Sequence, residues 1–143
     1  PMPLPVIAST LAEKKLLLAQ KPVKHVVDLA RHADVTFVGV GHLGESAPLL
    51  QDGFVTRDDM RALIKAGAVG EVIGWAFDRS GALIDGLTNE RVASVTLDQP
   101  AKRLVIGAAM GPTKTEALAG ALAGRLINGL ITNETTAERL LKR

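Results

Sequence analysis

The sequence lacks several residue patterns that identify common kinds of functional site. None of its 143 residues is cysteine, which excludes disulfides, thiolate metal ligands and a cysteine nucleophile. The three histidines, His25, His32 and His42, do not have the His-x-x-x-His spacing of a zinc site. No dinucleotide-binding glycine fingerprint is present either. The sequence therefore predicts neither a bound metal nor a cofactor.

Charge of one sign and long apolar runs are also missing. Seventeen Lys and Arg against fifteen Asp and Glu give a formal charge of +2, without a run of five or six like charges. This chain alone is therefore not expected to bind DNA. It has no stretch of about 18 apolar residues and no N-terminal signal segment, so we expect a soluble cytoplasmic protein that does not associate with a membrane.

The residues that are present predict one domain with an apolar core, since 47% of them are hydrophobic. Apolar runs typical of buried strands alternate with segments of helical periodicity. This alternation predicts an α/β fold in which crossover connections build a mainly parallel sheet with flanking helices. Strands are expected at 35–40, 72–77, 92–96, 104–108 and 126–132, with a hairpin turn at 78–81.

Helix starts are predicted mainly from capping boxes, in which a Thr hydroxyl and a Glu three residues later satisfy free amides of the first turn. Pro22 should stop or bend the first helix. Gly67 should end the helix that Thr56 caps. The expected boxes are Thr10 with Glu13, Thr113 with Glu116, and Thr135 with Glu138.

Lys114 follows a strand and a tight glycine turn, at the predicted first position of a helix. A cation there opposes the helix dipole by about 0.3 to 1 kcal/mol. Either the side chain simply points into water, or it meets an anion bound by the same free amides. Gly111, Thr113 and Lys114 are thus a candidate site for a phosphate or carboxylate, although the spacing does not match a P-loop.

Two further strand ends are candidates, because ligands of open parallel sheets bind beyond the carboxyl ends of the strands. Gly39 and Gly41 would let a ligand approach the backbone closely, but they also suit an ordinary strand exit. Glu71 and Asp78 bracket the expected strand at 72–77. Glu71 is a candidate for binding sugar hydroxyls or acting as a base, whereas Asp78 is well explained as the cap of an Asp-x-x-Gly turn.

Three stretches resemble, in order and spacing, the SorC family of bacterial sugar-responsive transcription regulators. They are "ADVTFVGVG", "IKAGAVGEVIGWAFDRSG" and "GAAMGPTKTEALAGALAGRLINGLITNETTAERLL". The resemblance covers most of the chain and implies a Rossmann-like fold similar to that of sugar-phosphate isomerases and deaminases. It also implies a phosphorylated sugar as effector and a homo-oligomer, either dimer or tetramer.

The resemblance also implies roles for particular residues. Lys114 is similar to the family's lysine that contacts the effector phosphate, and Glu71 to an acidic residue that lines the sugar site. Asp78, Gly39 and Gly41 would lie at the rim of the same pocket. "GAAMGPTK" departs from the family, whose members often have Gly-Gly before the lysine region, and this leaves the identity of the effector open.

Two parts of the SorC pattern are absent from the sequence: the helix-turn-helix, and the earlier effector region with its Gly-Gly-Thr phosphate loop. Together with the irregular start at residues 1–5, this predicts that residues 1–143 are the C-terminal portion of a sugar-binding effector domain. DNA would then be contacted only through the missing N-terminal domain.

Three functions remain open from the sequence. The first is an effector-binding and oligomerisation fragment of a regulator, with no catalytic residue. The second is a sugar-phosphate isomerase or deaminase, with Glu71 or Asp78 as base and Lys114 holding phosphate. The third is an assembly module, which would be favoured if a carboxylate of the same chain occupied the Lys114 site.

Overall fold

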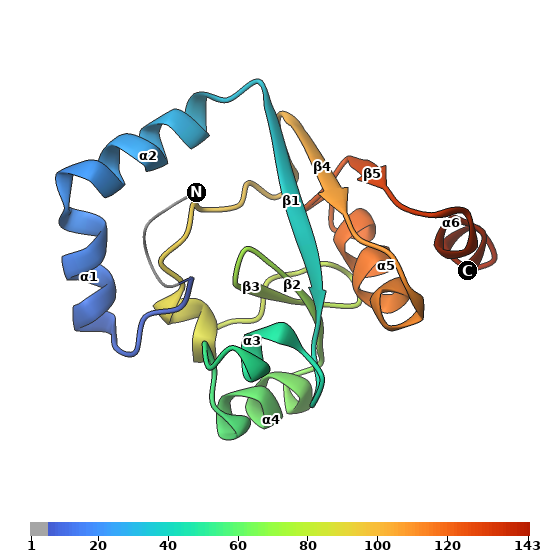
Figure 1. Cartoon of the computed structure of the whole chain (residues 1–143), viewed down its shortest axis with the longest axis horizontal. Coiled ribbons are helices and arrows are strands. Elements are labelled where there is room, and N and C mark those ends of the chain that lie inside the picture. The colour runs from blue at the N-terminus through green and yellow to red at the C-terminus, as the bar shows by residue number, and fades with distance from the viewer. Residues whose placement is uncertain (1–5) are drawn as a thin grey trace.

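A computed structural model describes residues 6–143, so the irregular segment expected at residues 1–5 lies outside the described part (Figure 1). Helices flank a five-stranded sheet, which confirms the α/β, Rossmann-like class. No helix of the described residues is long and apolar enough to cross a membrane. The elements are α1 (Leu11–Ala19), α2 (Lys21–His32), β1 (Val35–His42), α3 (Pro48–Gln51), α4 (Arg57–Lys65), β2 (Ala68–Val72), β3 (Trp75–Asp78), the 3₁₀ helix η1 (Leu87–Arg91), β4 (Leu104–Ala108), the 3₁₀ helix η2 (Pro112–Lys114), α5 (Thr115–Ala123), β5 (Gly129–Ile131) and α6 (Glu134–Leu141).

The sheet has the order β3-β2-β1-β4-β5. Parallel pairing joins β1, β4 and β5, and the hairpin β2–β3 extends the sheet with antiparallel pairing on the other side. β1 belongs to both parts, since residues 35–39 pair with β4 and residues 40–42 pair with β2. The end of β1 is therefore the place where the parallel and antiparallel parts of the sheet meet.

The main core lies between the sheet and α5. Val38 and Val40 of β1 pack there with Phe77 of the hairpin and Leu118 of α5, all of them buried. Gly120 lets α5 approach the hairpin closely, because a Cβ at that position would lie 2.9 Å from the Asp78 carbonyl oxygen. The packing of α5 in turn fixes the residues just before it.

The helix starts confirm part of the capping pattern. Thr10 caps α1 by accepting a bond from the Glu13 amide (3.1 Å), but the Glu13 carboxylate accepts from Ser9 rather than from Thr10. Thr56 caps α4 as expected and forms a complete capping box with Asp59. Gly67 follows α4 in the left-handed region, with φ of 89°.

The first helix stops just before Pro22, which confirms the expected break. The chain becomes extended at Gln20, with ψ of 134°, and a new helix, α2, starts at Lys21 with Pro22 in its first turn. This position tolerates proline because its missing N–H would have no partner inside the helix.

Two expected capping boxes are wrong. α5 starts only after η2, so Lys114 is its N-cap residue rather than its first helical residue, and Glu116 pairs with Arg79 (2.7 Å). α6 starts one residue before Thr135, because the Asn133 side chain accepts a bond from the Thr136 amide (3.0 Å). Asn is at least as good an N-cap as Thr, and it comes first along the chain.

The strand expected at 72–77 is also wrong. Ile73 and Gly74 form a tight turn with φ of 44° and 91°, so β2 ends at Val72 and β3 begins at Trp75. Two central residues with positive φ match the twist of a two-residue hairpin. The turn expected at 78–81 exists, but it follows the second strand of the hairpin.

Two more strands differ from expectation. At 92–96 a single bridge from Val92 to Ile7 replaces the expected strand. In the segment 126–132, only Gly129–Ile131 forms a strand. Leu126 and Ile127 are buried below α5 instead, so their apolar character reflects core packing rather than strand pairing.

Two glycines with similar backbone angles allow a test of how α5 is held against the hairpin. Gly81 (φ 80°) lies against the end of α5, where a Cβ would be 2.5 Å from Gly124 Cα, whereas nothing lies within 4 Å of a Cβ at Gly67 (φ 89°). Gly67→Ala should cost about 1 to 2 kcal/mol of unfolding free energy from backbone strain alone. Gly81→Ala should cost at least about 2 kcal/mol more. Urea denaturation measures both, and equal costs would contradict the close packing.

Candidate ligand-binding site

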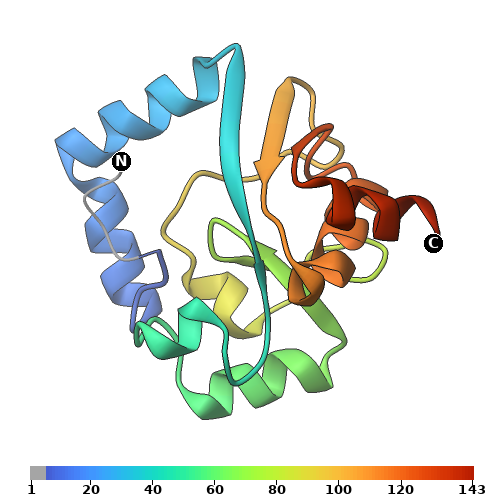
Figure 2. The ribbon, with the colours of Figure 1, turned by 45° about the vertical axis from the view of Figure 1, so that its right-hand side comes forward.

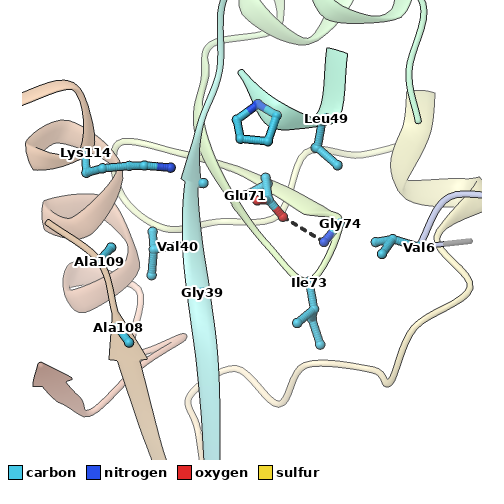
Figure 3. A pocket seen from close by; sticks show the side chains of 12 residues that line it. Val6, Gly39, Val40, Leu49, Glu71, Ile73, Gly74, Ala108, Ala109 and Lys114 are labelled. Atoms are coloured by element: carbon cyan, nitrogen blue, oxygen red, sulfur yellow. Dashed lines mark hydrogen bonds between the residues drawn. The ribbon is translucent and has the colours of Figure 1, made fainter. Parts of the chain in front are cut away.

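A pocket of about 390 Å³ lies where β1 and β4 end, beside the turn of the hairpin (Figure 3). Most of its wall is apolar or backbone. As described for residues 6–143, its lining contains two ionisable side chains, Glu71 and Lys114. The residues that line it are Val6, Gly39, Val40, Gly41, Pro48, Leu49, Glu71, Ile73, Gly74, Ala108, Ala109 and Lys114.

Four residues predicted from the sequence come together here. Gly39 and Gly41 belong to β1, Glu71 to β2, and Lys114 to the turn before α5. Lys114 lies at the expected strand-to-helix connection, and its side chain points toward the end of β1, with Glu71 on the other side of the strand in this view (Figure 3). The pocket thus has an ammonium group and a carboxyl group that come from different elements.

Gly41 makes room for the Glu71 carboxyl group. The two residues are direct partners in the antiparallel pairing of β1 with β2. A Cβ at Gly41 would overlap the Oε1 atom of Glu71, whereas nothing lies within 4 Å of a Cβ at Gly39. The other oxygen, Oε2, accepts a hydrogen bond from the Gly74 amide (2.8 Å). One oxygen of Glu71 is thus fixed by the hairpin turn, and the other lies against the β1 backbone.

Burial and the Lys114 ammonium shape the charge state of this site. Burial raises the pKa of the Glu71 carboxyl, and the Gly74 N–H and Lys114 offset part of that rise. Burial, followed by Lys114, lowers the pKa of His42, which favours its neutral form. Within residues 6–143 Lys114 forms no ion pair. Its charge is therefore not neutralised by a direct contact with Glu71.

Asp78 does not belong to this pocket, contrary to expectation. It lies in a separate depression of about 770 Å³, with Arg79, Ser80 and Glu116 in its lining. Its Oδ1 atom accepts bonds from the Ser80 hydroxyl (2.6 Å), the Ser80 amide (2.8 Å) and the Ala82 amide (3.0 Å). The Ser80 hydroxyl is the main cause of the lowered pKa of Asp78. Asp78 therefore caps its own turn, and the charges of Arg79 and Glu116 pair with each other.

Gly111 and Thr113 do not line the pocket either. The Gly111 amide donates to the Thr136 hydroxyl (3.0 Å), and the Lys114 amide donates to the Gly111 carbonyl (3.1 Å). The 3₁₀ turn before α5 occupies the Lys114 amide, and the Thr136 hydroxyl of α6 occupies the Gly111 amide. The expectation that the Gly111 and Lys114 amides would bind an anion together with the ammonium is therefore wrong, and the ammonium is the group that faces the pocket.

Sequence reasoning missed the part of the wall that the hairpin turn and α3 provide. Ile73 and Gly74 line the pocket, and Gly74 also holds Glu71. The glycine inside the apolar run "EVIGWAF" was the available signal for a turn. Leu49 of α3 was not predicted, because a helix of four residues has too short a pattern to recognise.

Comparisons with known proteins identify the family to which this chain is similar. A family profile described as "Putative sugar-binding domain" matches residues 1–142. The transcriptional regulator LsrR of Klebsiella pneumoniae is 34% identical over 99% of this chain and 44% of its own length. The full-length sorbitol operon regulator SorC of the same species superposes with a TM-score of 0.81, at 29% identity, over 96% of this chain and 45% of its own. A domain of a "possible sugar-binding transcriptional regulator" from Arthrobacter aurescens superposes with a TM-score of 0.84 at 26% identity. The match covers 98% of this chain and 54% of that domain.

The raised pKa of Glu71 predicts how stability changes with pH. The folded state holds this proton more tightly than the unfolded state, so the contribution of Glu71 to stability falls as pH rises from about 4.3 through the folded-state pKa. The difference in unfolding free energy between Glu71→Gln and the wild type should therefore change in favour of the variant as pH rises. Urea denaturation between about pH 4 and pH 8 measures the difference.

Asp78→Asn is the matched control, because its pKa is shifted in the opposite direction. The stability that this carboxylate contributes is present above its unfolded pKa and disappears as pH falls. The unfolding free energy of Asp78→Asn should therefore fall further below that of the wild type as pH rises. Parallel curves for wild type and Glu71→Gln would contradict the burial of Glu71.

Proposed function

Since this chain belongs to the family of sugar-binding domains found in transcriptional regulators, we propose that its pocket binds a phosphorylated sugar as an effector. The observation that carries the proposal is the Lys114 ammonium, which extends into the pocket without an ion pair in the described residues. A phosphate group accepts charge-assisted hydrogen bonds from such an ammonium.

Glu71 supplies the second half of the proposed recognition. Its Oε2 atom already accepts a bond from Gly74, which leaves capacity on Oε1 for a ligand hydroxyl. Burial raises the pKa of Glu71, and the negative charge of a nearby phosphate would raise it further, which favours the neutral carboxyl group. An ammonium group and a carboxyl group in an otherwise apolar wall suit a ligand with one anionic end and several hydroxyls.

The role proposed for the chain is effector binding and oligomerisation rather than catalysis. The chain spans about 44% of the length of its LsrR relative. We propose that it is the C-terminal portion of a cytoplasmic regulator whose DNA-binding region lies elsewhere. Effector binding would shift the equilibrium between oligomeric states only if the states differ in affinity for the sugar phosphate.

An isomerase or deaminase is less well supported by the pocket. Such chemistry needs an acid and a base placed about the reacting atoms. As far as residues 6–143 show, Glu71 is the one carboxyl group in the lining, and Asp78, the other candidate base, lies in a different depression. The named relatives are transcriptional regulators.

Lys114→Ala should weaken binding of a phosphorylated sugar by about 10- to 100-fold, the loss expected for one charge-assisted hydrogen bond. Isothermal titration with pentose and hexose phosphates measures the affinity, with the parent sugars and inorganic phosphate as reference ligands. The control is Lys102→Ala, because Lys102 is exposed and does not line the pocket. An equal effect of both variants would contradict the proposal, and so would turnover of the ligand.

Two glycines of β1 test the contribution of Glu71. Gly41→Ala should displace the Glu71 carboxyl and weaken sugar-phosphate binding by about tenfold, the loss of one hydrogen bond to a hydroxyl. Gly39→Ala adds the same methyl group to the pocket wall without touching Glu71, so any loss it causes reports the methyl group itself and not a displaced carboxyl group. An unchanged affinity in Gly41→Ala would show that Glu71 has no part in binding.

A further inference from the structure

The turn that carries Lys114 is held at two points by later parts of the chain. This turn connects β4 to α5, and Ala109 and Lys114 in it line the pocket. The Ala109 amide donates to the Ile131 carbonyl of β5 (3.2 Å). The Gly111 amide donates to the Thr136 hydroxyl of α6 (3.0 Å). The segments after α5 therefore hold the backbone that precedes α5.

α6 buries a hydroxyl group where an apolar side chain would also fit. The helix lies beside α5 in both views of the ribbon, and Thr136 is its buried residue, with 2% of its surface exposed (Figures 1 and 2). Leu140, one turn further along α6, packs against the main core. Valine has nearly the same shape as threonine and could be buried without a hydrogen-bond partner. The hydroxyl of Thr136 is explained by the Gly111 amide, which it satisfies.

Two hydrogen bonds connect Thr136 to the backbone of Lys114. Gly111 lies between them, because its amide donates to Thr136 and its carbonyl accepts from the Lys114 amide (3.1 Å). The φ of Gly111 is 107°, which favours glycine, whereas a Cβ at this position would meet nothing within 4 Å. The backbone angle rather than crowding therefore requires a glycine, and the two bonds hold that angle.

The direction of the Lys114 side chain depends on this backbone. Within residues 6–143 its ammonium forms no ion pair, so no oppositely charged side chain holds it at the pocket. Its place is therefore set by the end of the 3₁₀ turn and the start of α5, where Lys114 is the N-cap residue.

We propose that Thr136 is a positioning residue for effector binding, which fixes Gly111 and thereby the turn that directs the Lys114 ammonium into the pocket. This inference rests on the proposed function, since it concerns the lysine to which the phosphate would bind. Thr136 does not line the pocket and acts only through the turn. α6 is then a part of the effector site, and a change in its packing changes the affinity for the phosphate group.

Thr136→Val tests this role, because it keeps the size of the side chain and removes the acceptor of the Gly111 amide. Its affinity for sugar phosphate should fall about 3- to 30-fold, as measured by isothermal titration with the pentose and hexose phosphates. Thr136→Ser keeps the hydroxyl and should restore most of the affinity. Thr135→Val, at the exposed neighbouring position of α6, is the control and should bind like the wild type.

Combination with Lys114→Ala separates positioning from a general weakening of the fold. If Thr136 acts through Lys114, Thr136→Val should cause no further loss of affinity in a chain that already carries Lys114→Ala. An equal loss in both backgrounds would overturn the proposal, because Thr136 would then support the fold without directing the lysine.

The position of the ammonium can also be followed without a ligand. Burial is the larger cause of the lowered pKa of His42, and Lys114 is the second. In an NMR titration, Lys114→Ala should therefore raise the pKa of His42. Thr136→Val should raise it as well, and Thr136→Ser should leave it unchanged.

This titration distinguishes the inference from the proposed function. A pKa of His42 that rises in Lys114→Ala but not in Thr136→Val would overturn the positioning role, even where sugar phosphate binds to the wild type. If no sugar phosphate binds to the wild type, the proposed function fails and the inference fails with it.

Discussion

The pairing of Gly41 with Glu71 is the contact on which the site depends. β1 leaves its parallel pairing with β4 at residue 39 and pairs antiparallel with β2 over its last three residues. This change brings a carboxyl group from the hairpin over a glycine at the strand end, next to the lysine that precedes α5. A residue with a side chain at position 41 would push the carboxyl group away from this place.

The balance of charges in the pocket follows from that arrangement. Burial makes ionisation of Glu71 unfavourable and raises its pKa. The nearby ammonium of Lys114 favours ionisation, but it offsets only part of that rise. A phosphate bound to Lys114 would add negative charge beside this carboxyl group and would raise its pKa further. The site therefore suits an anionic ligand better than an ordinary ionised Glu–Lys pair would, because such a pair neutralises its own ammonium.

The sequence predicted the elements with strong periodicity and missed those decided by local competition. β1, β4 and the α4 start at Thr56 were correct, since long apolar runs and a complete capping pattern specify them. The hairpin was shifted, because Ile73 adopts a positive φ that a β-branched residue rarely has. For the site, Glu71 and Lys114 were predicted as pocket residues and both line it, whereas Asp78 is separated from them by the shift of the hairpin.

Amide chemical shifts in a two-dimensional NMR titration with a sugar phosphate would test the central claim most directly, because the 143-residue chain is small enough for complete assignment. The account predicts that the largest changes occur at Gly41, Gly74 and Lys114, around the pocket at the end of β1. Changes centred instead on Ser80 and Ala82, around the larger depression, would show that the ligand binds elsewhere and would contradict the account.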